Sequence, residues 1–381
     1  MERTDSTRPA RTTPTLLAGA VFLLAPITVF GAAEPSGAEL YRQACAHCHG
    51  ADGRGVAQER LRLEVPVPDF TDCSFATREP DADWVAVAHE GGPVRGFSRQ
   101  MPAFGDALGV AELERAMEHV RTFCPDPAWP RGELNLPRAL VTEKAYPEDE
   151  AVFTVGATTG GAGDVSTELV YETRFGARNQ VELSLPLAWR ETAPEEPGAG
   201  GREGWTSGPG DVAVGFKRAV YHSLERGDVF SVAAEVLLPT GDEDRGFGAG
   251  TPVVEPFVAY GRILPADGFL HVQAGAELPV DRDRATEEAF WRLAVGKTFT
   301  EGRWGRAWSP MVEVLGSREL TGGEEARWDL LPQLQVTLNQ RQHVMLDVGV
   351  RLPVAETRGR DPEVLVYLLW DWFDGGFLEG W

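Results

Sequence analysis

Cysteine and basic residues are both scarce in this sequence. Its 381 residues include only four cysteines, and 36 Lys and Arg stand against 58 Asp and Glu, which gives a formal net charge of −22 at pH 7. Nucleic acids and anionic lipid surfaces bind proteins through basic patches. The charge balance therefore argues against both kinds of partner.

An apolar run over residues 16–30 follows three arginines and ends in the small residues 31–33. This order is typical of a secretory signal peptide over residues 1–33. A retained transmembrane anchor is the alternative, but the run is short for a span and Pro26 interrupts it. No cysteine follows the expected cleavage site, so a lipid anchor is not indicated. We expect the protein to be exported.

Two of the cysteines lie in the run Cys45-Ala46-His47-Cys48-His49. The C-x-x-C-H spacing is typical of c-type haem attachment, in which two thiols reach the porphyrin and the adjacent histidine lies under the iron. A thioredoxin-like redox pair and half of a zinc site are the alternatives, but neither needs His49 directly after Cys48. The motif occurs once, so we expect one covalent haem c, bound by Cys45, Cys48 and His49.

Met101, followed by Pro102, is the candidate for the sixth ligand of the iron. A thioether is a soft ligand that suits haem iron, and the proline stiffens the loop that carries it. A lone methionine is more often part of a hydrophobic core. His89 and His119 are the competing ligands, although each lies in a helical pattern where a surface histidine is common.

Residues 34–125 resemble class I cytochromes c. A capping box that begins at Ser36 starts a helix leading into the haem motif, and an amphipathic helix near residues 110–123 ends the region. The resemblance implies a small all-α domain with covalent haem, iron bound by His49 and Met101, and one-electron transfer at an exposed haem edge. Two protein ligands would leave no open site on the iron, so we expect an electron carrier and not an enzyme such as a peroxidase.

The two remaining cysteines are Cys73 and Cys124. Two cysteines left over in an oxidising compartment are typical of one disulfide. Two unrelated buried thiols are the alternative. We expect the disulfide, which the simplest class I cytochromes c do not have.

The residue pattern changes after the haem region. Residues 126–148 are rich in proline and lack a steady period, which predicts a stiff, extended linker. From residue 149 onward, apolar and polar residues alternate with the period of a β-strand. Twelve such runs lie near residues 150–158, 165–175, 179–190, 211–222, 228–239, 253–264, 268–280, 288–300, 306–317, 327–338, 342–354 and 363–373.

A soluble β-sandwich would show the same alternation, but two features favour an outer-membrane barrel. Short and long connections alternate, as periplasmic turns and outer loops do, and tryptophans gather at strand ends as two aromatic girdles would. Those at the long-loop ends are Trp189, Trp291 and Trp328, and those at the short-turn ends are Trp308, Trp370 and Trp372. The polar face would form a wet lining that includes Glu168, Glu172, Glu182, Glu235, Gln273, Glu277, Arg292, Glu313, Gln333, Gln335 and Asp347.

Residues 149–381 resemble outer-membrane channel families, especially the one named for phenol-degradation gene clusters, although no short motif is diagnostic. The resemblance implies an all-β antiparallel outer-membrane barrel, and the twelve alternating runs predict about twelve strands for it. Such barrels usually end with an aromatic residue that closes the last strand, whereas this chain continues to Trp381, the candidate assembly signal.

The sequence thus predicts a multidomain protein with a signal peptide (1–33), a cytochrome c domain (34–125), a linker (126–148) and a transmembrane β-barrel (149–381). We expect the barrel to contact outer-membrane lipid and the haem domain to exchange electrons with a periplasmic redox protein. The competing hypothesis is a channel for small solutes in which the haem domain is a sensor, plug or tether. An even number of strands puts both chain ends on the periplasmic side.

Overall fold

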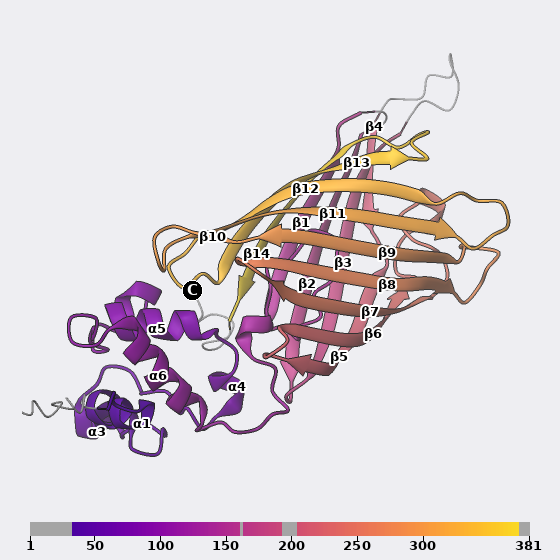
Figure 1. The fold of residues 1–381 in the computed structure, drawn as a ribbon. Coiled ribbons are helices and arrows are strands. Elements are labelled where there is room, and N and C mark those ends of the chain that lie inside the picture. Colours follow the sequence, from indigo (N-terminus) through magenta and orange to yellow (C-terminus); the bar gives the residue numbers. More distant parts are fainter. Residues whose placement is uncertain (1–32, 161–162, 193–203, 373–381) are drawn as a thin grey trace, which may run out of the picture. The chain divides into compact units, whose positions relative to one another are not determined.

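The computed structural model describes residues 33–160, 163–192 and 204–372 (Figure 1). Residues 1–32 of the expected signal peptide and the candidate assembly signal Trp381 lie outside the described residues. Short helices come first along the chain, and an antiparallel sheet follows. Within the described ranges, no helix combines the length and the apolar character that a membrane crossing requires.

The helical region begins as the sequence predicts. The Ser36 side chain accepts a hydrogen bond from the backbone N–H of Glu39, and the Glu39 carboxylate accepts one from the N–H of Ser36. These bonds satisfy donors that a helix start leaves free. The elements are α1 (Gly37–Leu40), the π-helical turn η1 (Tyr41–Cys45), α2 (Ala46–His49), α3 (Gln58–Leu61), α4 (Cys73–Ala76), α5 (Asp81–Glu90), the 3-10 turn η2 (Gly92–Arg95), α6 (Val110–Arg121) and the 3-10 turn η3 (Gly132–Leu134).

The first and last helices of this region pack against each other. Gly37 of α1 lies so close to the carbonyl of Arg115 in α6 that a side chain at position 37 would clash with it. This close approach lets Leu40 and Tyr41 pack with Leu113 and its neighbours in one buried cluster. The haem motif follows α1 through the single turn η1, so this packing positions it.

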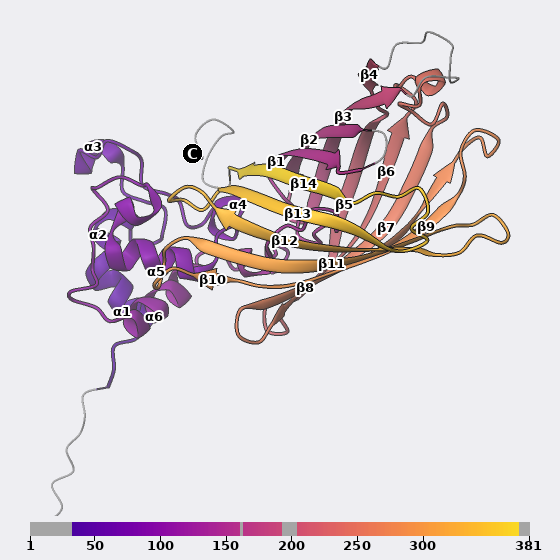
Figure 2. The same ribbon diagram turned by 90° about the horizontal axis from the view of Figure 1, so that it is seen from above.

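The sheet closes into a barrel (Figures 1 and 2). Strands that follow one another in the chain pair antiparallel, and β14 pairs with β1 to complete the circle. Segments β4 and β5 both pair with β3, and β9 and β10 both pair with β11, so the described segments make twelve barrel strands. This number confirms the prediction.

The observed bounds follow the predicted runs closely, except that the sequence did not reveal β4. They are β1 (Glu150–Thr158), β2 (Asp164–Phe175), β3 (Asn179–Thr192), β4 (Gly204–Pro209), β5 (Val212–Ser223), β6 (Asp228–Leu238), β7 (Val253–Leu264), β8 (Gly268–Pro279), β9 (Glu288–Lys297), β10 (Phe299–Thr300), β11 (Ala307–Glu319), β12 (Arg327–Thr337), β13 (Val344–Ala355) and β14 (Glu363–Asp371). One further 3-10 turn, η4 (Glu243–Arg245), lies in a long loop.

The outer face of the barrel is apolar. Large hydrophobic side chains are exposed on strand after strand, which a water-soluble sandwich would not tolerate. A closed barrel with such a belt is instead the arrangement that crosses a lipid bilayer. The belt includes Phe153, Leu169, Leu183, Phe216, Val232, Val258, Leu293, Val312, Leu334, Val348 and Leu368.

Two of the predicted girdle tryptophans contact each other. The rings of Trp291 and Trp328 meet edge to face, with centroids 5.4 Å apart, and both residues are paired with Gly316 of the intervening strand β11. A side chain at position 316 would clash with the Trp291 indole. The glycine therefore makes room for this aromatic pair at the long-loop end.

Candidate functional site

The haem motif lies at a change of helix type. The π-helical turn η1 ends at Cys45, and α2 carries Cys48 and His49. The Tyr41 hydroxyl donates a 2.7 Å hydrogen bond to the carbonyl of Gly50, which fixes the far end of the motif. Both thiols are free and half-buried, and burial raises the pKa of Cys45 to about 11.

His49 has the features of an iron ligand. Its ring stacks on Phe70 with centroids 4.8 Å apart, which fixes its orientation. Burial lowers its pKa to about 4, so the imidazole stays neutral, the form that binds metal. Its Nδ1 is buried and has no hydrogen-bond partner among the described residues. A buried polar atom without a partner calls for an explanation. Together with the two free thiols, this ring fits a c-type haem.

The loop that carries Met101 is held by its backbone. The N–H of Gly92 donates to the carbonyl of Met101 at 3.1 Å, a side chain at position 92 would clash with the carbonyl of Ser98, and Gly91 packs tightly against the backbone of residues 101–103. Gly91 also has a positive φ of 84°, which glycine adopts without strain. Iron ligation by Met101 stays a prediction.

The two competing histidines both have structural neighbours. The Nδ1 of His89 lies 2.8 Å from the Glu90 carboxylate, and the His89 ring lies 4.8 Å from that of Trp304. The His119 ring packs against Tyr41 and Phe123, with centroids 5.4 and 5.2 Å away. These contacts account for both histidines without iron.

Cys73 and Cys124 form the expected disulfide. It joins the start of α4 to the residues just after α6, across 51 positions of sequence. Nearby, the Arg121 guanidinium lies 4.2 Å above the Trp84 ring and donates to Asp81 at 2.7 Å. The end of α6 is therefore fixed by both covalent and polar contacts.

Residues 130–149, here called the luminal segment, run through the interior of the barrel. Inward-facing side chains accept hydrogen bonds from its backbone: Gln333 from Leu140 at 2.9 Å, Glu313 from Val141 and Thr142 at 3.0 and 2.7 Å, Gln273 from Glu143 at 3.1 Å, and Gln180 from Glu148 at 2.7 Å. Buried backbone groups need hydrogen-bond partners. The luminal segment is mostly neither helix nor strand, so the barrel side chains act as the partners of its backbone.

The carbonyls of the luminal segment are bound in the same way. Tyr367 donates to the carbonyl of Arg138 at 2.7 Å, a nitrogen of His271 lies 2.9 Å from that of Pro137, and Ser231 donates to that of Ala145. The donors come from three different strands. The barrel wall therefore binds the main chain of the luminal segment along its length.

Buried ion pairs hold the charged side chains of the luminal segment. Arg138 donates to Glu150 at 2.6 Å and to Glu172 at 2.8 Å, and Lys144 lies 2.6 Å from Glu148 and 3.2 Å from Glu150. All five residues are buried. Removing one partner of such a network leaves an uncompensated buried charge, which costs several kcal/mol.

Apolar contacts complete the filling of the barrel. Leu134 and Tyr146 pack into one cluster with Phe257, and Leu136 packs into a second with Phe269. The sequence predicted residues 126–148 only as a linker. The structure shows that most of this segment is part of the barrel interior.

The predicted lining residues do point inward, but the expectation that they are wet is wrong where the luminal segment passes. Glu172, Gln273, Glu313, Gln333, Gln335 and Asp347 are all buried. Most of these bind the luminal segment, so they are shielded from water by this chain's own residues. The sequence contained only an indirect signal that the barrel is filled. The proline-rich segment contains lysine, arginine and glutamate, and the strands that follow carry inward polar side chains that need partners.

The helical region and the barrel belong to one compact unit, Ser36–Trp381, and share polar contacts. His343 is 4% exposed, with its Nε2 2.9 Å from Glu79 and its Nδ1 3.1 Å from Asp371. Arg78 lies 2.6 Å from Asp149. His343 follows a short turn, and Asp371 ends the last strand, so these contacts lie at the short-turn end of the barrel.

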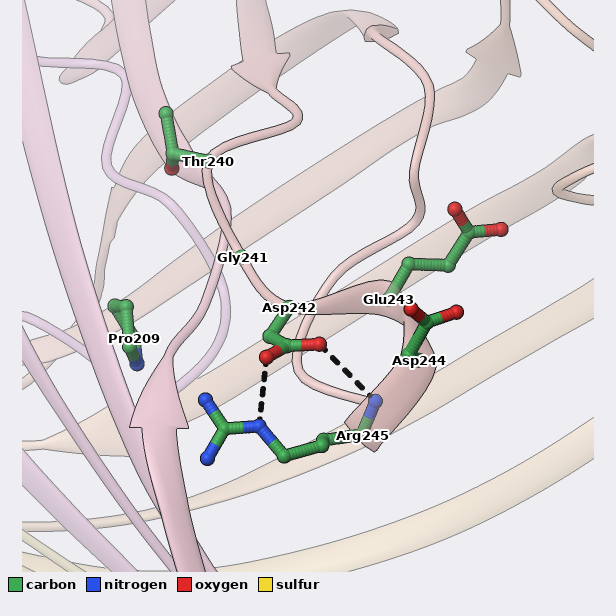
Figure 3. A pocket seen from close by; sticks show the side chains of 7 residues that line it. All are labelled: Pro209, Thr240, Gly241, Asp242, Glu243, Asp244 and Arg245. Carbon is green, nitrogen blue, oxygen red and sulfur yellow. Dashed lines mark hydrogen bonds and ion pairs between the residues drawn. The ribbon is translucent and has the colours of Figure 1, made fainter.

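A surface pocket lies at the long-loop end, lined by Pro209 and residues 240–245 (Figure 3). The Nε of Arg245 donates to Asp242 at 2.6 Å, and the Asp242 carboxylate also accepts from the backbone N–H of Arg245. Asp242 and Arg245 thus satisfy each other within the pocket, whereas Glu243 pairs with Arg284 of the neighbouring long loop at 2.5 Å.

Family comparisons agree with this architecture. Residues 143–374 match the family described as "Putative MetA-pathway of phenol degradation". The chain belongs to this family. Residues 32–120 match a second family, described as "Cytochrome C oxidase, cbb3-type, subunit III". This phenol-degradation family member thus carries a cytochrome c-type domain, which implies haem, before its barrel.

Solved structures that resemble this chain include an outer membrane channel and two porins. The COG4313 outer membrane channel from Pseudomonas putida F1 has 12% identity and a TM-score of 0.44, over 62% of this chain and 99% of that one. The KdgM porin has 9% identity and a TM-score of 0.36, and the NanC porin 8% and 0.39; each covers 58% of this chain and 98% of its own. Among curated proteins, none matches the chain.

Proposed function

We propose that the protein is a haem c electron carrier anchored in the outer membrane by its barrel. Cys45 and Cys48 would bind one haem through thioether bonds, and His49 and Met101 would ligate its iron. The haem supplies reversible one-electron chemistry. Phe70 orients His49, and Tyr41 fixes the end of the motif. This role makes the protein a carrier and not an enzyme.

The filled barrel is the observation that favours an anchor. The luminal segment crosses the interior in buried hydrogen bonds and ion pairs, so the described form supports membrane attachment better than free diffusion of a solute. Lipid would contact the outer apolar belt. Electron exchange would then take place at the haem domain, outside the barrel.

Contacts at the short-turn end support a periplasmic haem domain. Turns of this length face the periplasm in outer-membrane barrels, and the turns at residues 301–306 and 338–343 both contact the haem domain. The redox partner would therefore be a periplasmic protein. One haem cannot carry electrons across an apolar band about 25 Å tall, so a route to the cell surface would need another cofactor protein.

Membrane fractionation with haem staining tests this proposal. The full-length protein should appear in the outer-membrane fraction as a haem-stained band, and protease added to intact cells should cut long loops such as residues 239–252 while sparing the haem fragment. A band without haem would refute the carrier role. Loss of the haem fragment while the outer membrane is sealed would refute the periplasmic location.

A channel whose haem domain acts as a sensor is the second candidate. It is favoured by one observation: the luminal segment continues directly from the haem domain, so movement of one can pull on the other. Conductance across a planar bilayer, measured with the haem oxidised and then reduced, separates the candidates. Only a redox-gated channel changes its conductance between the two states.

A further inference from the structure

A short turn of the barrel carries a tryptophan that packs into the haem domain. Trp304 lies in the turn between β10 and β11, yet it contacts the buried cluster of the haem domain that includes Leu113 and Val120. Its ring centroid lies 4.8 Å from that of His89. Trp304 falls outside both predicted girdles of the barrel.

Polar contacts fix this turn in place. Arg95 is 5% exposed, and its Nη1 donates to the carbonyl of Trp304 at 2.6 Å while its Nε donates to Asp83 at 2.7 Å. Gln342 of the next short turn donates to the carbonyl of Gly305 at 2.8 Å. A buried arginine held by a carboxylate and a carbonyl gives the turn one defined position.

His89 links Trp304 to the loop that carries Met101. Gly105 lies so close to the His89 imidazole that a side chain at position 105 would overlap it, and the N–H of Gly105 donates to the carbonyl of His89 at 3.0 Å. The N–H of Phe104 likewise donates to the carbonyl of Ala88 at 3.0 Å. The end of the Met101 loop, at residues 104 and 105, is therefore bonded to the backbone of Ala88 and His89, and the His89 ring rests against Trp304.

We propose that Trp304 is a positioning residue for the haem site, through which the barrel holds the Met101 loop in place. The inference rests on the proposed function, because it concerns the loop that would supply the sixth iron ligand. The potential of a haem depends on its axial ligands and on its exposure to solvent. Loosening this loop should therefore lower the midpoint potential.

The test compares Trp304→Ala with Trp308→Ala in the full-length protein. Trp308 follows the same turn, but its Nε1 donates to Glu301 at 2.9 Å and it is not part of the haem-domain cluster. Hydrogen exchange at the amides of Phe104 and Gly105 should become faster in Trp304→Ala alone, and the midpoint potential should fall in that variant alone. Trp304→Phe keeps an aromatic ring beside His89, so its exchange rates and midpoint potential should lie close to those of the wild type.

The outcomes separate this inference from the proposed function. Absence of haem from the wild-type protein would refute the proposed function, yet hydrogen exchange would still decide whether Trp304 holds the loop. Equal exchange in the two tryptophan variants would overturn the inference. If Trp304→Ala does not assemble, Arg95→Lys supplies the same test, because it keeps the charge beside Asp83 and removes the bond to the Trp304 carbonyl.

Discussion

The haem domain and the barrel are built with opposite polarity. Leu113 and Val120 are buried in the haem domain, whereas Leu334 of the barrel is 41% exposed and Glu313, on the neighbouring strand, is fully buried. Hydrophobic burial drives the first arrangement in water. In the second, lipid receives the apolar side chains, and the interior must satisfy its polar groups by hydrogen bonds and ion pairs. The chain therefore follows the burial pattern of a water-soluble domain first and that of a membrane barrel afterwards, and the change comes where the luminal segment begins, near residue 130.

The largest expected effect is loss of haem without loss of the barrel. Cys45→Ala combined with Cys48→Ala removes both attachment points, so haem staining should vanish completely. No described hydrogen bond or ion pair joins Cys45 or Cys48 to a barrel strand. The variant should therefore keep the heat-dependent gel mobility of a folded barrel. Cys73→Ala with Cys124→Ala is the matched control, and it should retain haem.

Replacing Met101 should change the iron and leave the haem attached. In Met101→Ala the thioether ligand is lost while both attachment points remain, so a six-coordinate, low-spin iron should gain an open or water-filled site. Optical and magnetic spectra of the oxidised protein report this change. An unchanged spectrum would transfer the ligand role to another residue, and His89 would be the first to examine.

Arg138→Ala tests the polar interior of the barrel. It leaves Glu172 buried without its ion-pair partner, while Glu150 keeps Lys144, so the free energy of unfolding of the barrel should fall by about 3–5 kcal/mol. Chemical unfolding in lipid vesicles measures it. Arg262→Ala, at an exposed position of β7, should change stability by less than about 0.5 kcal/mol. Similar losses in both variants would show that the luminal network is not stabilising.

How far the sequence could predict this structure differs between the two regions. Lipid on one side of a strand imposes a strict period of two, so β1 and β7 lie at their predicted residues. The c-type haem motif could be recognised because C-x-x-C-H is local in sequence, and attachment of haem through its cysteines stays a prediction. The position of the luminal segment could not be predicted, because its partners are far away in sequence and leave no local period. Gln333, for example, lies 193 residues from Leu140. Trp304 was missed for the same reason.

The disulfide should stabilise the haem domain alone. Cys73→Ala with Cys124→Ala opens a loop closed across 51 positions of sequence, so in the chain-entropy model the haem domain should lose about 3–4 kcal/mol. Haem absorbance during chemical unfolding follows this domain, while barrel stability should not change. Mass labelling of free thiols in the denatured, unreduced wild type provides the check on the bond itself: two labelled cysteines would rule it out.

The smallest expected effect concerns the apolar belt. Leu113→Ala and Leu334→Ala remove the same atoms from opposite settings. At Leu113, which is 1% exposed, the loss includes both transfer from water and a cavity in a rigid core, so the haem domain should lose about 3–5 kcal/mol. At Leu334, lipid chains fill the vacated space, so only the transfer term remains and the barrel should lose about 2 kcal/mol or less. Unfolding of each region is followed by its own signal, haem absorbance for the first and tryptophan fluorescence for the second. If Leu334→Ala costs as much as Leu113→Ala, the belt at this strand packs against a rigid surface, and the barrel has a protein partner there in place of lipid.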